Sequence, residues 1–260
     1  MWGGDTLNHS GLLRHKVSLV TGGSGDIGRA IAKRLAVEGS NVLITFAGAE
    51  DRAKRTLEEI REAGGFAQSF RLDQRDPEDI ERVIAHVQNE LGALDILVNN
   101  AAWNIGIPFP ELHQLTPEIW DRVLETNLRA PFLLSRAAAS LLKVGGGHIV
   151  NISSAGGITP GSSSIAYSSS KAGLNHLTRC LAVAMAPDVS VNCVAPGLVE
   201  DTRMANRLPR AVSEGAKRQA ILGKVGQVED IAEQVLTFVT SSSVTGQTIV
   251  IDGGLPAAMR

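Results

Sequence analysis

A strand, a glycine-rich turn and a helix follow one another without a break near the amino end, and this succession constrains the fold most. Residues 16–21 form an apolar, β-branched run typical of a buried strand. The turn at 21–28 comes next, and the helical periodicity of 29–38 ends at Gly39. Glycines let the backbone approach a pyrophosphate, and a helix amino terminus offers it unpaired N–H groups. The pattern predicts a dinucleotide-binding unit, with an ordinary glycine-rich turn as the alternative.

Strand-like and helix-like runs alternate along the rest of the 260-residue chain. The strand-like runs are 42–46, 66–72, 94–99, 147–153, 190–195 and 248–251, and the helix-like runs are 49–63, 77–91, 117–142, 166–185 and 228–240. Alternation of this kind predicts an α/β, Rossmann-type, doubly wound parallel sheet of seven strands with helices on both faces. We expect a single domain over 1–260, in which 1–11 is a flexible extension.

Two long segments, 102–115 and 197–226, lack a regular pattern and are predicted to be irregular loops. Loops of this length inside a compact domain are more often functional than idle. The motifs near residues 21, 99, 154 and 196 all follow strands, so we expect the binding crevice at the carboxyl ends of the sheet.

Composition excludes several classes of protein. The net charge of −2, with acids and bases interspersed, gives no electrostatic footprint for nucleic acid, and no apolar run reaches the length of a membrane span. The first residues do not resemble a signal peptide, so we expect a cytoplasmic protein. Cys180 and Cys193 are expected to be reduced, packed thiols, and the six scattered histidines do not suggest a metal site.

Tyr167 and Lys171 are four residues apart in a helix-like run, with Ser154 upstream. Residues at this spacing share one face of a helix, one turn apart. An ammonium group there lowers the pKa of a phenol, which can then exchange a proton with a substrate oxygen. Taken alone, the motif favours a chance surface pair, and its context in this chain reverses that interpretation.

The order of motifs resembles the short-chain dehydrogenase/reductase family in its common form of about 250 residues. The resemblance extends from Leu12 to Gly254, and Ser154 precedes Tyr167 by 13 residues, the family's usual separation. The landmarks are, in order, 21–28, Asp73, 99–102, Asn127, Ser154, Tyr167 with Lys171, 191–192 with 196–197, and the ending 245–247 and 252–254. The resemblance implies an NAD(P)-dependent oxidoreductase that interconverts a ketone and a secondary alcohol by hydride transfer.

The resemblance also implies roles for four catalytic residues. Tyr167 would be the acid for carbonyl reduction or the base for alcohol oxidation. Lys171 would lower the pKa of Tyr167 and bond the nicotinamide ribose, and Ser154 would bond the substrate oxygen. Asn127 would hold a water that links Lys171 to solvent. Ser153 is the rival of Ser154, but strand alternation points it to the opposite face.

Other positions look like cofactor contacts by the same resemblance. Asp73 would accept a hydrogen bond from the adenine amino group, whereas Asn99 would tie strands together. The full set of expected contacts is Gly22, Ser24, Gly25, Asp26, Ile27, Gly28, Asp73, Gln74, Asn100, Ala101, Ala102, Tyr167, Lys171, Pro196, Gly197, Val199 and Thr202.

The chain departs from the family pattern in the turn and in the loop after Pro196. Asp26 replaces a glycine; it could cap the helix, and we expect its carboxylate to point away from the pyrophosphate. Asp201 stands where a threonine is usual, and a one-residue insertion would restore the pattern at Thr202. Two smaller departures are Ala102 in place of glycine and a short loop at 241–244.

Cofactor choice depends on the end of the second strand, where a carboxylate normally bonds the ribose 2′-OH of NAD. The strand here ends in Phe46, Ala47 and Gly48, with no acid before Glu50. Arg52 or Lys54 could reach a 2′-phosphate. Against this, position 25 is glycine where many NADP-using relatives carry a basic residue, and Glu50 and Asp51 could repel a phosphate. We therefore predict NADP, with NAD as the alternative.

The substrate is expected to be a small, moderately apolar ketone or secondary alcohol, held between 103–112, 155–165 and 198–218. The candidates for lining are Trp103, Ile105, Ile107, Ile158, Ile165, Arg203, Arg207 and Arg210, with loop anchors or subunit contacts as the alternative. A 3-oxoacyl-thioester reductase is the alternative within this class. A non-catalytic dinucleotide-binding regulator would lack the tyrosine, serine or lysine, and a lyase or dehalogenase on the same scaffold would lack the turn or the lysine. Apolar faces on 117–142 and 166–185 favour a homotetramer, or else a dimer.

Overall fold

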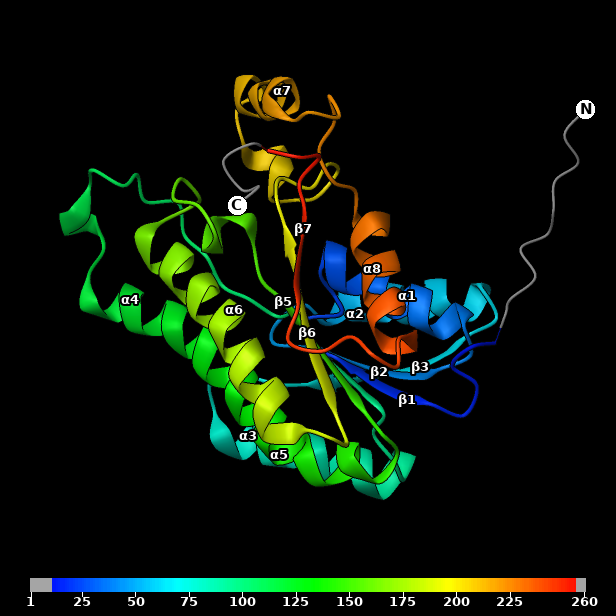
Figure 1. The fold of residues 1–260 in the computed structure, drawn as a ribbon. Helices are drawn as coiled ribbons and strands as arrows, with labels where there is room; N and C mark the ends of the chain where they lie inside the picture. The colour runs from blue at the N-terminus through cyan, green and yellow to red at the C-terminus, as the bar shows by residue number, and fades with distance from the viewer. Residues whose placement is uncertain (1–10, 256–260) are drawn as a thin grey trace, which may run out of the picture.

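The computed structural model describes residues 11–255 and contains one parallel sheet of seven strands in the order β3-β2-β1-β4-β5-β6-β7 (Figure 1). The strands are β1 (Val17–Val20), β2 (Asn41–Phe46), β3 (Phe66–Arg71), β4 (Ile96–Asn99), β5 (His148–Ile152), β6 (Ser190–Pro196) and β7 (Thr248–Ile251). Every pairing is parallel. The strand order reverses between β1 and β4, which is where an open α/β sheet forms its binding crevice.

Helices cover both faces of the sheet, as the sequence predicts. Three of them, α1 (Asp26–Val37), α2 (Glu50–Glu62) and α8 (Val228–Thr240), share a buried apolar cluster on one face. The opposite cluster is built by α3 (Pro77–His86), α5 (Ala130–Val144) and α6 (Ile165–Met185). Neighbouring residues of β1 and β4 alternate between the clusters: Val20 and Val98 face the first, while Leu19 and Leu97 face the second.

Two predicted helices contain a π-helical turn. The run at 77–91 is α3 followed by η1 (Val87–Leu91), and the run at 117–142 is α4 (Pro117–Leu124), η3 (Glu125–Arg129) and α5. Single π-helical turns are rare and often lie at functional sites. The π-helical turn η3 is therefore a candidate location for functional residues.

The segment 197–226 was predicted to be an irregular loop, and this is wrong in part. It contains a short 3₁₀ turn, η5 (Ala205–Arg207), and the helix α7 (Arg210–Gln219). No residue of α7 is buried, and Val212 is its only large apolar residue, so the sequence there does not suggest a core helix. Figure 1 shows α7 beyond the carboxyl end of β6, apart from the two helical layers. The segment 102–115 also contains a short turn, η2 (Leu112–Gln114), and another, η4 (Ala155–Gly157), follows β5.

Three further features are the state of the cysteines, the search for metal-ligating clusters and membrane-spanning helices, and the amino-terminal residues. Cys193 is buried, but Cys180 is exposed, so only one of the two free thiols is packed. Within 11–255 no cluster of metal-ligating side chains is present, and no helix there is long and apolar enough to cross a bilayer. The expected flexible extension at 1–11 lies, apart from Gly11, outside the described residues.

Candidate active site

The turn between β1 and α1 has the shape of a phosphate cradle. Gly22 has a φ of +64°, and a Cβ on Gly28 would come within 2.4 Å of the Gly22 carbonyl oxygen. Only glycine fits both constraints without moving the backbone. Gly25 is the cap residue of α1, and no side chain bonds the N–H groups of the first helical turn. The turn therefore fits the pyrophosphate of a dinucleotide.

Side chains at the end of β4 fix this cradle to the neighbouring strand. The Asn100 side-chain amide donates to the carbonyl oxygens of Thr21, at 2.8 Å, and of Gly22, at 3.3 Å. The Gln74 amide donates to the carbonyl oxygens of Ala101 and Thr126. Asn99 instead donates to Asn151 of β5 at 2.9 Å, which fits its expected role in tying strands together. Ala102, which follows Ala101 in the chain, is exposed.

Asp73 lies after β3, but its carboxylate already has a partner. Arg75 donates to it from the backbone and from its guanidinium, the shortest distance being 2.7 Å. The hydrogen bond from the Arg75 guanidinium lowers the pKa of Asp73, and burial opposes this. An adenine amino group would therefore share the carboxylate with Arg75, and the adenine contact stays a prediction.

Tyr167, Lys171 and Ser154 come together at the carboxyl end of β5. The Lys171 Nζ lies 5.7 Å from the centre of the Tyr167 ring and donates to the Ile152 carbonyl oxygen at 2.8 Å. Ser154 makes a hydrogen bond to the Tyr167 side chain. Ser153 turns the other way and donates to the Lys171 carbonyl oxygen, so alternation along the strand separates the two serines as predicted.

Burial dominates the electrostatics of this trio. It raises the pKa of the Tyr167 phenol, and the hydrogen bond from Ser154 opposes the rise. It also lowers the pKa of Lys171 to about 8. The expected lowering of the tyrosine pKa is therefore not seen in the structure, because the burial of the phenol is the largest influence on that pKa. Lys171 nevertheless remains mainly protonated at neutral pH.

Asn127 lies in the π-helical turn η3 and connects it to two other parts of the site. Its oxygen accepts from the Trp103 N–H at 2.9 Å, and its nitrogen donates to the Trp103 carbonyl oxygen and to Ser170 Oγ. The side chain thus fixes the loop after β4 against α6. Its expected role of holding a water remains a prediction.

The segment after β6 turns at Asp201 and Thr202, and the one-residue insertion stays a prediction. Asp201 has a φ of +57°, the left-handed conformation, which residues other than glycine adopt only occasionally. Thr202 is buried, donates to the Val199 carbonyl oxygen at 2.9 Å and accepts from the Ala205 N–H. The start of the segment is fixed by the Gly197 N–H, which donates to the Ile251 carbonyl oxygen at 2.8 Å.

Asp26 does not cap α1, because Gly25 is the cap residue and no side chain makes a cap hydrogen bond there. Its carboxylate instead accepts from the backbone N–H of Arg203 at 2.9 Å and from the Arg203 guanidinium at 3.2 Å. These residues are 177 positions apart, and no local pattern in the sequence signals their contact.

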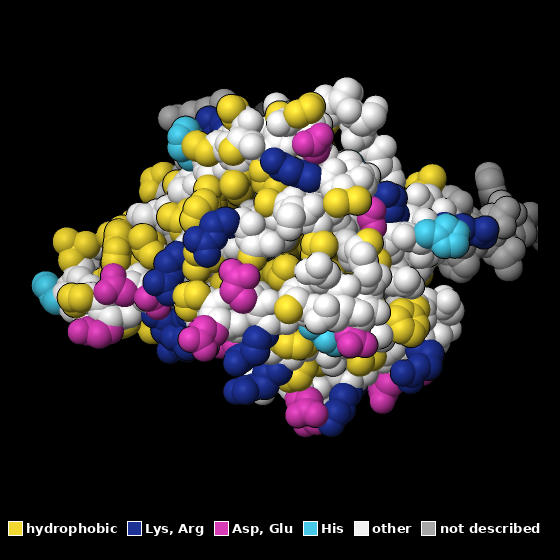
Figure 2. Space-filling model, turned by 90° about the horizontal axis from the view of Figure 1, so that it is seen from below, with side chains coloured by type: hydrophobic (Ala, Val, Ile, Leu, Met, Phe, Trp, Pro, Cys, Tyr) yellow, Lys and Arg dark blue, Asp and Glu magenta, His cyan; other side chains and the backbone are white. Residues whose placement is uncertain are grey.

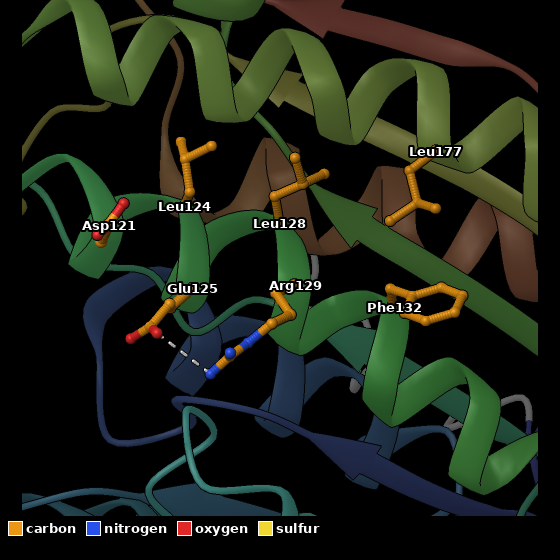
Figure 3. A pocket seen from close by; sticks show the side chains of 7 residues that line it. All are labelled: Asp121, Leu124, Glu125, Leu128, Arg129, Phe132 and Leu177. Carbon is orange, nitrogen blue, oxygen red and sulfur yellow. Dashed lines mark ion pairs between the residues drawn. The ribbon is translucent and has the colours of Figure 1, made fainter.

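The three predicted substrate segments meet at Asn104. Its amide donates to Ser163 Oγ at 3.1 Å and contacts the Met204 sulfur at 3.7 Å. The backbone N–H of Ile107, which is buried, donates to the Ser163 carbonyl oxygen. Trp103 packs instead against the guanidinium of Arg122, 4.2 Å from the ring centre. A hollow of about 500 Å³, shown in Figure 3, lies elsewhere, between η3, α5 and α6, and does not include Tyr167.

Comparisons with known proteins agree with this fold and site. Residues 23–256 match the family model described as enoyl-(acyl carrier protein) reductase. The 3-oxoacyl-(acyl-carrier-protein) reductase FabG of Aquifex aeolicus is 39% identical over 248 residues, covering 94% of this chain and 98% of the relative. A dehydrogenase/reductase from Sinorhizobium meliloti superposes with a TM-score of 0.87 at 39% identity, over 97% of this chain and 98% of that one. A short-chain dehydrogenase from Burkholderia cenocepacia, solved in complex with NADP, gives 0.86 at 34% identity, over 94% and 99%.

The fold and the site define a nicotinamide-dependent oxidoreductase that uses NADP or NAD and acts on the carbonyl or alcohol group of a small molecule. The chain belongs to the short-chain dehydrogenase/reductase family. The predictions of the fold class and of the oxidoreductase class are therefore confirmed.

Proposed function

We propose that this protein is an NADP-dependent reductase of a moderately apolar ketone, with Tyr167 as the proton donor. The observation that carries the proposal is the buried group of Tyr167, Ser154 and Lys171 at the end of β5. The bound cofactor supplies the hydride, and the chain supplies placement and proton transfer. In this account Tyr167 protonates the carbonyl oxygen, and Ser154 donates a hydrogen bond to the charge that develops there.

The other site residues position this chemistry. Lys171 favours the charge left on Tyr167 and bonds the nicotinamide ribose, and Asn127 keeps the neighbouring loop in place and links Lys171 to solvent. The residues proposed to hold the cofactor are Gly22, Ser24, Gly25, Asp26, Ile27 and Gly28 in the turn, Asp73 and Gln74 after β3, Asn100, Ala101 and Ala102 after β4, and Pro196, Gly197, Val199 and Thr202 after β6, together with Tyr167 and Lys171.

A preference for NADP over NAD is supported by the end of β2. No carboxylate follows Phe46 before Glu50, and Glu50 pairs with Lys54 at 3.0 Å. An acceptor for the ribose 2′-OH is therefore lacking at the usual place. We expect kcat/KM to be higher for NADPH than for NADH, measured on one ketone in the same buffer. A clear preference for NADH would mean that Glu50 or Asp51 reaches the ribose and would contradict the proposal.

Reduction of a 3-oxoacyl thioester is the second candidate, and the similarity to the Aquifex aeolicus reductase favours it. Comparing kcat/KM for a 3-oxoacyl thioester with that for a free ketone of the same chain length separates the candidates. We also infer a cytoplasmic location, which the two unpaired cysteines support.

We propose further that the protein is a homotetramer, with a dimer as the alternative. The support is an apolar surface formed by Leu124, Leu128, Phe132 and Leu177, whose side chains converge between the helices in Figure 3. Phe132 is 42% exposed. Charged residues of both signs, interspersed with apolar ones, cover the face seen in Figure 2.

We expect light scattering at micromolar concentration to give the mass of four chains. The substitution Phe132→Asp puts a charge on the apolar surface and should shift the protein to smaller assemblies. A wild-type monomer at that concentration would refute the proposal.

A further inference from the structure

The Arg203 side chain lies over the glycine turn, although it comes from the segment that follows β6. Asp26 holds it there by accepting from its backbone N–H at 2.9 Å and from its Nε at 3.2 Å. Two independent bonds to one carboxylate fix both the chain and the guanidinium at this point. The terminal nitrogens of Arg203 make no hydrogen bond within the part of the chain that the structure describes.

The guanidinium of Arg203 lies beside the space that glycine leaves at position 25. A Cβ built on Gly25 would lie 3.9 Å from one terminal nitrogen of Arg203. A side chain at position 25 and the guanidinium of Arg203 would thus reach into the same region. The turn lacks a cation of its own there, and Arg203 provides one from a distant part of the chain.

A second guanidinium faces the same region from α2. Thr56 Oγ1 contacts the carbonyl oxygen of Gly23 at 3.3 Å, which packs this face of α2 against the glycine turn. Arg52 is one helical turn earlier on the same face, toward the end of β2. Burial lowers the pKa of Arg52, and repulsion from Arg203 lowers it further, so the two cations lie near each other. Lys54, the other cation considered for this role, is paired with Glu50.

We propose that Arg203 and Arg52 bind the phosphate on the adenosine ribose of the cofactor, with Asp26 as the positioning residue for Arg203. The region between the glycine turn and the end of β2 is where a dinucleotide places this ribose. Two guanidinium groups with free donors suit a dianionic phosphate and gain little from a hydroxyl. The inference rests on the proposed use of NADP and names the residues responsible for it.

The test is direct binding, by calorimetry, of adenosine 2′,5′-bisphosphate and of 5′-AMP, which lacks the 2′-phosphate. We expect the wild-type protein to bind the bisphosphate more tightly. Arg203→Met and Arg52→Met should each weaken bisphosphate binding about ten- to a hundredfold, the effect of losing a charge-assisted hydrogen bond, and leave 5′-AMP binding unchanged. Asp26→Asn should weaken bisphosphate binding less than Arg203→Met does.

The matched control is Arg61→Met, which removes the same group from the last turn of α2 and should change neither affinity. Equal losses for both ligands in Arg203→Met would place Arg203 at a shared phosphate and overturn the proposal, as would no loss at all. If the wild-type protein does not discriminate between the ligands, the preference for NADP itself fails. If the wild-type protein binds the bisphosphate more tightly than 5′-AMP and Arg203→Met keeps both affinities, only the role of Arg203 is refuted.

Discussion

Tyr167→Phe should leave the protein folded and able to bind the cofactor, but it should lower kcat by about 10²- to 10⁴-fold. Phenylalanine keeps the buried ring and removes the hydroxyl, which is the only part of Tyr167 that can give a proton to a carbonyl oxygen. The packing of α6 against the sheet is unaffected, because the ring is retained. The lost hydrogen bond to Ser154 affects a single polar contact.

Steady-state rates and cofactor affinity should be measured on the same preparation of Tyr167→Phe, with circular dichroism to confirm folding. Ser154→Ala is the companion variant, and it should act mainly on kcat, because the hydrogen bond to the substrate oxygen strengthens in the transition state. A folded Tyr167→Phe protein with the wild-type kcat would remove Tyr167 from the mechanism.

Lys171→Ala should abolish most turnover and also weaken cofactor binding, since the proposed ammonium group serves both Tyr167 and the nicotinamide ribose. A loss in both quantities distinguishes it from Tyr167→Phe, which should affect turnover alone. Lys171→Met, which keeps the length of the side chain but not its charge, is expected to behave in the same way. An unchanged cofactor affinity in both variants would contradict the second role of Lys171.

The pKa of Lys171 gives this prediction a pH dependence. Burial holds that pKa at about 8, below the usual value for lysine, so the ammonium is present below pH 8 and is lost as the pH rises through it. The thiol of Cys193, which interacts with Lys171, has its pKa raised by burial to about 11 and stays neutral in this range. The wild-type cofactor affinity should therefore fall above about pH 8, and the affinity of Lys171→Met should not.

The layered fold was predictable from the sequence because buried parallel strands appear in it as short runs of apolar, β-branched residues. β5 and β6 sit between helices on both faces, and nearly every residue in them is apolar or buried. Helix α7 has no buried residue and only one large apolar residue, Val212, so it lacks the apolar core face that identifies the other helices. Local propensity is the remaining sequence signal for such a helix, and it is a weak guide.

The candidate catalytic residues were predictable because they lie in recognisable motifs at strand ends, and the structure brings Ser154, Tyr167 and Lys171 together as those motifs require. The π-helical turn that carries Asn127 was missed, and so were the hydrogen bonds from Asn127 to Trp103 and Ser170, which join residues far apart in the sequence. The pairing of Asp26 with Arg203 was missed for a similar reason. Only the folded chain brings those two residues together.

The most direct test of this account is the oxidation of NADPH, followed by absorbance, with a panel of ketones and the wild-type protein beside Tyr167→Phe. At least one ketone should be reduced to its secondary alcohol, with one NADPH consumed for each alcohol formed. Tyr167→Phe should lose this activity while still binding NADPH. Equal NADPH consumption by both proteins, or consumption without formation of an alcohol, would contradict the proposed function.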